Sequence, residues 1–372
     1  MRWIALLLSV LGALVGGEAL ARRVVDDVYL ERQIGSGGLL VPYEPGLSAD
    51  LLQPEFRVRY DINRFGYRDR LDRSEARTPG VPRVALLGDS FAAGWGVEFA
   101  DTFASRFERA TGIEVIDSAK NGGCPLWYVP QARWLRERFS PDWLLVQLFD
   151  NDPDDDRQFM DRFELAYGDR VGELPRAIGP LDTLGRWLRH AWDATVIQHR
   201  FRQLQRRLSG KRLARTPYVK PGAKPDAPIL TRAQAIARYA IDLSPNRPWD
   251  GPFSFHDPGQ REEWRERIAW NAQLLDQLIE EAARADVPVA VLYIPAYPVF
   301  LRAREPNPAA AAVREVAERR GALWLDATDW FATAPTPAEL YYAFDSHLDP
   351  AGHAAIAAAL ARELAPRVRV AY

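Results

Sequence analysis

The chain has 372 residues, of which 26% are charged and 47% are hydrophobic. These proportions are typical of soluble globular proteins and exclude the disordered, collagen-like and coiled-coil classes. At roughly 100–200 residues per domain, the length allows one large domain or two ordinary ones. The formal net charge is only −2, so we expect no nucleic-acid partner.

The first 23 residues predict a signal peptide or a membrane anchor. Arg2 precedes an uncharged, apolar stretch over residues 3–17, and Ala19-Leu20-Ala21 resembles a signal-peptide cleavage site. The stretch is shorter than the roughly 20 apolar residues that span a membrane, which leaves the choice between signal and anchor open. In both interpretations the rest of the chain is translocated. We therefore expect a secreted or membrane-anchored protein whose membrane association is made through the N-terminus.

Residues 24–80 form an N-terminal extension with little regular pattern. Glycines at 35, 37 and 38 and several prolines interrupt it. Residues 56–60 alternate between apolar and basic side chains, which predicts a strand. A turn-like run, Asn63-Arg64-Phe65-Gly66-Tyr67-Arg68, follows that strand.

Residues 81–372 alternate between short apolar runs and helical patterns. We predict strands over residues 83–87, 113–116, 143–149, 287–294 and 322–325. We predict helices over residues 101–110, 131–139, 262–285, 308–320 and 350–364. Strands separated by helices form βαβ units and a parallel sheet. The expected fold class is therefore α/β, with a flavodoxin-like, doubly wound, five-stranded parallel sheet.

The alternation is interrupted between about residues 157 and 258. This region holds an amphipathic stretch at 181–208, a linker rich in proline, lysine and glycine at 215–228, and a helical pattern at 231–239. It shows no strand pattern, so we predict a helical insertion that forms a lid or lies on a membrane surface.

Ser90 is the first candidate for catalysis. It directly follows the first core strand, in Gly88-Asp89-Ser90, and a helix is expected after it. Reacting groups of open α/β sheets gather at the carboxyl ends of strands, where the amides of a following helix also stabilise negative charge. Most serines before helices only cap them, so this position alone is a weak signal.

The segment Asp345-Ser346-His347 strengthens the interpretation of Ser90. A serine hydroxyl becomes a nucleophile when a neutral imidazole takes its proton, and a carboxylate fixes the tautomer of that imidazole. In an extended segment, Asp345 and His347 would lie on one face. The segment follows the last predicted strand, so it can meet the loop of Ser90 at the same edge of the sheet. Of the other four histidines, His353 belongs to the last helix and is expected to pack or cap there.

Two further loops offer hydrogen-bond donors for a negatively charged intermediate. Asn121-Gly122-Gly123 follows the second strand, and a glycine lets a backbone N–H approach a ligand closely. Asn151 follows the third strand and could donate its side-chain amide. The alternative is ordinary turn chemistry, which these residue types also favour.

The sequence offers no convincing metal or cofactor site. The acidic run at residues 150–156, with Asp161 beyond it, suggests a calcium loop, but it lacks the required glycine at the sixth position and contains Pro153. Cys124 is the only cysteine, which excludes a disulfide within the chain and a zinc site built on several cysteines. No phosphate-binding loop is present. We therefore expect no metal and no cofactor.

Four segments, taken in order, resemble the motifs of the SGNH or GDSL-type hydrolase family. They are Gly88-Asp89-Ser90, Asn121-Gly122, Asn151-Asp152 and Asp345-Ser346-His347. The segment Asn63 to Arg68, followed by Gly94-Trp95-Gly96-Val97, is similar to a bacterial, membrane-associated branch of this family. The Asp-x-His spacing departs from the commoner Asp-x-x-His and also occurs in relatives that transfer acetyl groups to sugars.

The resemblance implies a role for each matching residue. Ser90 would be the nucleophile, His347 the base and Asp345 its partner, and the oxyanion would be held by the N–H groups of Ser90 and Gly122 and by Asn151. The expected activity is that of an esterase on ester-linked acyl groups, such as O-acetyl groups of envelope glycans or lipids, in the periplasm or at the membrane. An O-acyltransferase with the same site and an inactive scaffold that binds polysaccharide or a membrane partner are the alternatives.

Overall fold

A computed structural model describes residues 3, 9, 12–20, 43, 45–173, 228–245, 249, 251–301 and 307–370. The amphipathic stretch expected at 181–208 and nearly all of the linker at 215–228 lie outside the described residues. So does most of the N-terminal signal or anchor, of which residues 12–20 are helical. Within the described ranges, no helix is both long enough and apolar enough to cross a membrane.

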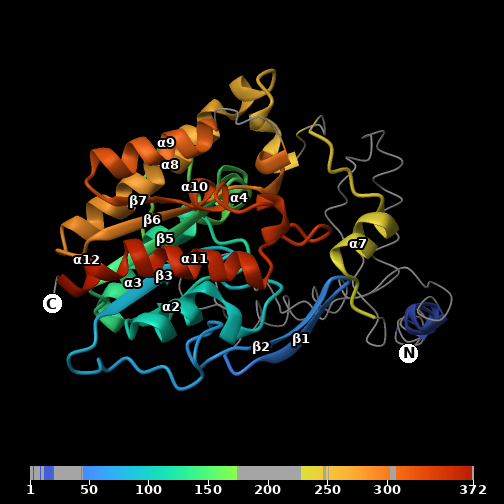
Figure 1. Cartoon of the computed structure of the whole chain (residues 1–372), viewed down its shortest axis with the longest axis horizontal. Helices are drawn as coiled ribbons and strands as arrows, with labels where there is room; N and C mark the ends of the chain where they lie inside the picture. The colour runs from blue at the N-terminus through green and yellow to red at the C-terminus, as the bar shows by residue number, and fades with distance from the viewer. Residues whose placement is uncertain are drawn as a thin grey trace.

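The centre of the molecule is a five-stranded parallel sheet (Figure 1). Its strands are β3 (Arg83–Leu87), β4 (Glu114–Asp117), β5 (Trp143–Phe149), β6 (Val289–Ile294) and β7 (Leu323–Asp326). They lie in the order β4-β3-β5-β6-β7, which is the flavodoxin-like order. The predicted fold class is confirmed, and each predicted strand differs from the observed one by two residues or fewer at its ends.

Helices cover both faces of the sheet. On one face lie α3 (Pro125–Phe139), α8 (Arg261–Ala283) and α9 (Pro308–Arg319), and on the other α2 (Phe103–Thr111), α11 (Pro350–Glu363) and α12 (Ala365–Val370). Successive side chains of a strand point to opposite faces, so β3 sends Ala85 and Leu87 into one core and Val84 and Leu86 into the other. Shorter elements are α4 (Asp152–Phe159), α7 (Arg232–Tyr239), α10 (Ala327–Phe331) and the 3-10 turns η1 (Phe99–Asp101), η2 (Met160–Phe163), η3 (Gly251–His256), η4 (Tyr297–Leu301) and η5 (Pro337–Leu340).

Helix α3 begins six residues before the predicted start. The prediction began after Pro130 because proline removes a backbone donor and usually breaks a helix. In the structure Pro130 lies inside α3, and the helix begins at Pro125, where a proline is tolerated. The first turns are held by burial, since Trp127 and Tyr128 are at most 1% exposed in the core.

The extension before the sheet contains an antiparallel hairpin of β1 (Ser48–Gln53) and β2 (Phe56–Asp61). Strand β2 was predicted, but β1 was not, because its sequence has no β-branched residue and places Leu51 and Leu52 side by side. The hairpin packs against loops that follow the sheet strands. The ring of Phe56 lies 4.9 Å from that of Tyr342, and the ring of Tyr60 lies 6.3 Å from that of Trp95.

In the described part of the interrupted region at 157–258, the structure has helices, turns and irregular segments and no strand. Helix α7 begins as predicted, because Thr231 and Gln234 form reciprocal side-chain bonds to the backbone at its start. The N–H of Leu230 donates to the carbonyl of Pro54 at the tip of the hairpin. Figure 1 shows α7 beside that end of the hairpin.

Arg68 joins the extension to the loop that follows Ser90. Its guanidinium is 1% exposed and donates to the carbonyls of Ala93 (3.0 Å), Gly94 (2.6 Å) and Val97 (2.7 Å), and to that of Arg59 (3.0 Å). It also lies 3.6 Å from the centre of the Tyr60 ring. The run from Asn63 to Arg68 and the segment Gly94-Trp95-Gly96-Val97 are therefore in direct contact.

We predict that Arg68→Met lowers the free energy of unfolding by about 3 kcal/mol or more, because several buried carbonyls lose their donor while side-chain length is kept. Urea denaturation measures the change. The matched control is Arg64→Met at an exposed position in the same run, which should change stability by no more than about 0.5 kcal/mol. Equal effects of the two substitutions would contradict the role given to Arg68.

Candidate active site

Ser90 lies at the carboxyl end of β3 in a tightly packed turn. A Cβ atom on Gly88 would lie 2.4 Å from the Cβ of Ala92 and 2.7 Å from Oε1 of Gln147, so only glycine fits there. Asp89 is buried, and its Oδ1 accepts the N–H of Phe91 at 2.8 Å. These contacts direct the chain sharply away from the sheet at Ser90, which stays partly exposed.

The helix expected after Ser90 does not follow directly. Residues 91–96 form turns, η1 comes next, and α2 begins only at Phe103. The turns are closed by the bonds from Arg68 and by the N–H of Trp95, which donates to the carbonyl of Ser90 at 2.9 Å. The amides of α2 are therefore not adjacent to Ser90, and the expected contribution of a helix N-terminus was wrong.

The loop with Asp345 and His347 is a tight turn and not the extended segment that was predicted. Ser346, between them, has a φ of 75°, in the left-handed region. The loop closes because the N–H of Tyr342 donates to the carbonyl of His347, and the N–H of Ser346 donates to the carbonyl of Tyr342. A left-handed residue other than glycine costs about 1–2 kcal/mol, which the surrounding contacts must offset.

Three side chains from the two loops form one hydrogen-bonded chain. Oγ of Ser90 lies 2.8 Å from Nε2 of His347, and Nδ1 of His347 lies 2.5 Å from Oδ1 of Asp345. Asp345 is 6% exposed, whereas the His347 side chain is 23% exposed. A carboxylate only accepts, so Nδ1 carries the imidazole proton and Nε2 is left to accept the proton of Ser90.

Two aromatic side chains that the sequence analysis did not assign to the site hold Asp345 and His347 in place. The indole N–H of Trp95 donates to Oδ2 of Asp345 at 3.3 Å, and its ring lies 5.9 Å from that of His347. The ring of Phe91 lies 4.8 Å from the ring of His347 on the side of the Ser90 turn. Trp95 stands in the Gly94-Trp95-Gly96-Val97 run, so that motif was the available signal for it.

The loop after β4 brings Gly122 to the same edge of the sheet as Ser90. The N–H of Lys120 donates to the carbonyl of Gly88, and a Cβ on Gly123 would lie 2.5 Å from that carbonyl oxygen. Gly122 has a φ of 66°, which suits glycine. Within the described part of the chain, no hydrogen bond uses the N–H of Ser90 or of Gly122, so both donors are free for a ligand.

Asn151 lies after β5, the other neighbour of β3. Its Nδ2 donates to Oδ2 of Asp155 at 2.8 Å, and its Oδ1 is buried without a partner among the described residues. An amide nitrogen carries two hydrogens, so one is left after Asp155 has accepted the other. The adjoining segment packs against the Ser90 turn, because the rings of Phe149 and Phe91 are 4.1 Å apart.

The acidic run at 150–156 is used inside the fold. Asp150 accepts the N–H of Ala296 at 2.8 Å and bonds to His256 at 3.3 Å. Asp152 accepts the N–H of Phe149, and Asp156 accepts the N–H of Leu126 at 2.8 Å. Across the described ranges, no group of three or more histidine, cysteine, aspartate or glutamate side chains is placed to hold a metal ion.

Several carboxyl groups near the site are kept from water. Burial raises the pKa of Asp89 to about 6, against a bond from the N–H of Phe91 and the neighbouring His347. Burial and the nearby Asp89 raise the pKa of Asp152 and of Asp155 well above the ordinary value. Burial alone would also raise the pKa of Asp150, but His256 and its hydrogen bonds hold it below the ordinary value.

The other described histidines are buried away from Ser90. His353 lies in α11, as predicted, where Nδ1 accepts the N–H of Phe103 at 3.1 Å, and burial lowers its pKa to about 3. His256 ends η3, is 2% exposed, and its ring stacks on those of Trp249 and Phe255. His190 and His199 lie outside the described residues.

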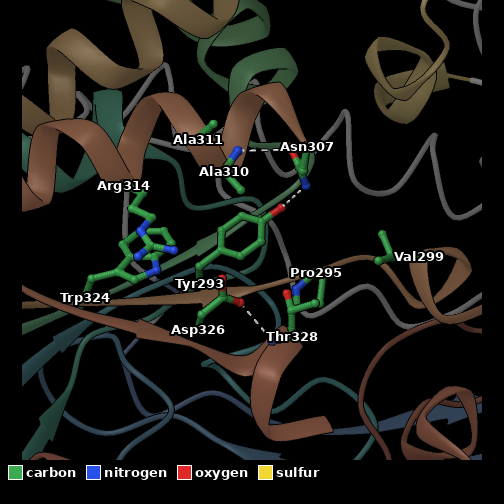
Figure 2. Close-up of a pocket in the computed structure, with 10 residues that line it drawn as sticks. All are labelled: Tyr293, Pro295, Val299, Asn307, Ala310, Ala311, Arg314, Trp324, Asp326 and Thr328. Carbon is green, nitrogen blue, oxygen red and sulfur yellow. Dashed lines mark hydrogen bonds between the residues drawn. The ribbon is translucent and has the colours of Figure 1, made fainter. Parts of the chain in front are cut away.

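A pocket of about 310 Å³ lies at the carboxyl ends of β6 and β7. Figure 2 shows its lining, in which the hydroxyl of Tyr293 meets Asn307, while Trp324 and Arg314 lie on the opposite side of the Tyr293 ring. Neither the hydrogen-bonded chain of Ser90 nor the loops of Gly122 and Asn151 line this pocket. The candidate active site is therefore a separate feature, at the edge formed by β4, β3 and β5.

The hydrogen-bonded serine, histidine and aspartate thus lie together at the carboxyl end of β3 in a flavodoxin-like parallel sheet. Residues 86–355 match the GDSL-like lipase/acylhydrolase family. The match covers well over half of the chain, and the protein therefore belongs to this family of acylhydrolases, as its four short motifs predicted.

Comparison with solved structures finds esterases and acylhydrolases. The esterase EstA from Pseudoalteromonas sp. has 10% identity and a TM-score of 0.38, over 77% of this chain and 97% of that chain. A lipase/acylhydrolase from Enterococcus faecalis has 13% identity and a TM-score of 0.37, over 77% of this chain and 97% of that chain. A two-domain esterase active on acetylated mannans has 10% identity and a TM-score of 0.37, over 78% and 50%. No curated protein sequence matches this chain significantly.

We predict that the thiol of Cys124 is unreactive in the folded protein, although it lies near the loop of Gly122. Cys124 is 0% exposed, and burial raises the pKa of its thiol well above the ordinary value. A disulfide reagent such as dithiobisnitrobenzoate should react on the order of 100-fold more slowly in native buffer than in guanidinium chloride, because modification requires local opening. Similar rates in the two conditions would show that the thiol is accessible.

Proposed function

We propose that this acylhydrolase is an esterase in which Ser90, His347 and Asp345 are the catalytic residues. The observation that carries the proposal is the hydrogen-bonded chain from Oγ of Ser90 through His347 to Asp345, with distances of 2.8 and 2.5 Å. Such a chain is the arrangement that activates a serine hydroxyl. Its partial exposure at His347 leaves the hydroxyl within reach of a substrate.

In the reaction, Oγ of Ser90 attacks the ester carbonyl while Nε2 of His347 takes the hydroxyl proton. The N–H groups of Ser90 and Gly122 and the amide of Asn151 stabilise the oxyanion of the tetrahedral intermediate. His347 then gives its proton to the departing alcohol, which leaves an acyl group on Ser90. Water, activated by the same imidazole, releases the acid and restores the serine.

We propose further that the enzyme works outside the bacterial cytoplasm on O-acetyl or similar acyl groups of envelope glycans or lipids. The apolar stretch after Arg2 supports export, and residues 12–20 of that region are helical. Trp95, which is partly exposed beside His347, supplies aromatic surface near the proposed nucleophile, which suits an acyl chain or a sugar ring. No metal or cofactor takes part in the proposed reaction.

Two alternatives from the sequence analysis lead to different products. An O-acyltransferase would pass the acyl group to a sugar hydroxyl. An inactive scaffold would neither hydrolyse the ester nor transfer its acyl group. Release of acetate from acetylated glycans without an added acceptor indicates hydrolysis. Consumption of the acyl ester only when an acceptor sugar is present indicates transfer. The intact hydrogen bonds at Ser90 favour an active enzyme over a scaffold.

We expect Ser90→Ala to lower kcat for p-nitrophenyl acetate by about 10³-fold or more and to abolish labelling by a fluorophosphonate. The matched control is Ser118→Ala. Ser118 is a buried serine after the neighbouring strand, where its hydroxyl donates to the carbonyl of Leu86. That control should lose about 1 kcal/mol of stability but keep its kcat. Equal activity of Ser90→Ala and the wild type would refute the proposed function.

We expect Asn151→Ala to lower kcat by about 10²–10³-fold with a smaller change in KM, because the amide is needed mainly when the oxyanion forms. Asn151→Asp keeps the shape but places an acceptor where a donor is required, so its kcat should be lower still. Steady-state kinetics on one short ester measures both. A rise in KM at constant kcat would instead assign Asn151 to binding of the ground state.

A further inference from the structure

The carboxylate of Glu55 accepts three consecutive backbone N–H groups of the loop that carries the proposed catalytic pair. The N–H of Ala343 donates to Oε1 at 3.0 Å, and those of Phe344 and Asp345 donate to Oε2 at 2.8 and 3.0 Å. Glu55 stands in the turn between β1 and β2, 290 residues before Asp345 in the chain. The hairpin tip thus reaches the loop directly.

Glu55 is 6% exposed, and burial raises the pKa of its carboxyl above the ordinary value, although the three N–H groups act in the opposite direction. Among the described residues it forms no ion pair with an arginine, lysine or histidine. The negative charge is therefore held by the backbone dipoles of the loop. A buried carboxylate with this arrangement is expensive to form, which makes a purely incidental contact a poor explanation.

The same three residues lead straight into the strained turn of the site. Asp345 is fixed at its backbone by Glu55 and at its side chain by Trp95. Ser346 then takes its left-handed conformation, and His347 follows. The backbone amides on Glu55 therefore decide where the Asp345 carboxylate lies relative to the imidazole of His347.

Helix α7 packs against the same loop and against the hairpin tip. The ring of Tyr239 stacks on that of Phe344 at 4.1 Å, and the guanidinium of Arg232 donates to the carbonyl of Tyr341. The N–H of Leu230 holds the carbonyl of Pro54, next to Glu55. Hairpin tip, catalytic loop and α7 form one packed cluster, which restrains the loop against rotation.

We propose that Glu55 is a positioning residue for catalysis, which holds the backbone at Asp345 so that its carboxylate meets His347 in the reactive geometry. The inference rests on the proposed function, because the hydrogen bonds of Glu55 go to the loop at residues 343–345 and not to Ser90. It acts through the loop alone. Loss of its carboxylate would leave the serine, histidine and aspartate present but misaligned.

The test compares Glu55→Gln with the wild type. An amide has the same shape but offers a donor at one end, so at least one of the loop N–H groups loses its acceptor. We expect kcat for p-nitrophenyl acetate to fall about 10- to 100-fold with KM nearly unchanged, as expected for a misplaced catalytic group. The rate of fluorophosphonate labelling should fall with it. Glu55→Asp, which keeps the charge on a shorter side chain, should recover part of the loss.

The matched control is Asp50→Asn, in the same hairpin, where an exposed aspartate pairs with Arg59. It should leave kcat at the wild-type value. All assays are made well below the melting temperature of each variant, so that a loss of stability alone does not lower kcat. Wild-type kcat in Glu55→Gln, with only a lower melting temperature, would overturn the inference and assign Glu55 a structural role. If Glu55→Gln does not fold, kcat of Glu55→Asp is compared with kcat of the wild type instead. A lower kcat supports the inference, and a wild-type kcat overturns it.

A second readout is independent of turnover. We expect the proton between Nδ1 of His347 and Oδ1 of Asp345, which are 2.5 Å apart, to give a far-downfield proton resonance, to be assigned by its absence in His347→Gln. This resonance should shift or vanish in Glu55→Gln and persist in Asp50→Asn. An unchanged resonance in Glu55→Gln overturns the inference. If Ser90→Ala is as active as the wild type, the proposed function fails, whereas the resonance still reports whether Glu55 aligns the pair.

Discussion

The hydrogen bond between Oγ of Ser90 and Nε2 of His347 joins loops that are 257 residues apart in the chain. Several side chains of the described residues, among them Trp95, Arg68 and Glu55, hold one or both of these loops in place. The parallel sheet places the loop of Ser90 at the edge where its strands end, and the chain reaches that edge with the loop of His347 only after α10 and η5. The sheet alone leaves each loop free to turn. The final geometry therefore depends on how the polar backbone of both loops is satisfied.

The N-terminal extension supplies many of the hydrogen-bond partners for the backbone of these loops. Arg68 donates to carbonyls of the loop after Ser90, and Glu55 accepts N–H groups of the loop before His347. One side chain is a cation facing acceptors, and the other is an anion facing donors. Both are buried, where bonds to charged groups are stronger than in water and an unmet partner is more costly. The hairpin is thus part of the framework of the site.

The acidic segment after β5 illustrates how burial changes the role of a motif. As a sequence, residues 150–156 suggest a cation site. In the structure their carboxylates accept backbone and side-chain donors from several elements, and one of them orients Asn151. Burial and the nearby Asp89 raise the pKa of Asp152 and of Asp155 well above the ordinary value. The segment therefore serves as a polar support beneath the edge of the sheet.

The sequence by itself determined the α/β class, the five strands and the positions of Ser90, Gly122 and Asn151 after strands β3, β4 and β5, because these depend on local apolar patterns and on short motifs. It also marked Asp345 and His347 as a motif, although α10 and η5 separate that motif from the end of β7. It did not reveal Glu55, the bond of Trp95 to Asp345, or the left-handed Ser346. The bonds of Glu55 and Trp95 join segments 250 or more residues apart, and a single glutamate or tryptophan has no local pattern that marks its partner. The turn at Ser346 is closed by bonds within residues 342–347, but its residue types do not mark a left-handed serine. Only the tertiary structure decided them. An unpaired polar group costs free energy only where it is buried, and distant segments of the chain determine which groups are buried.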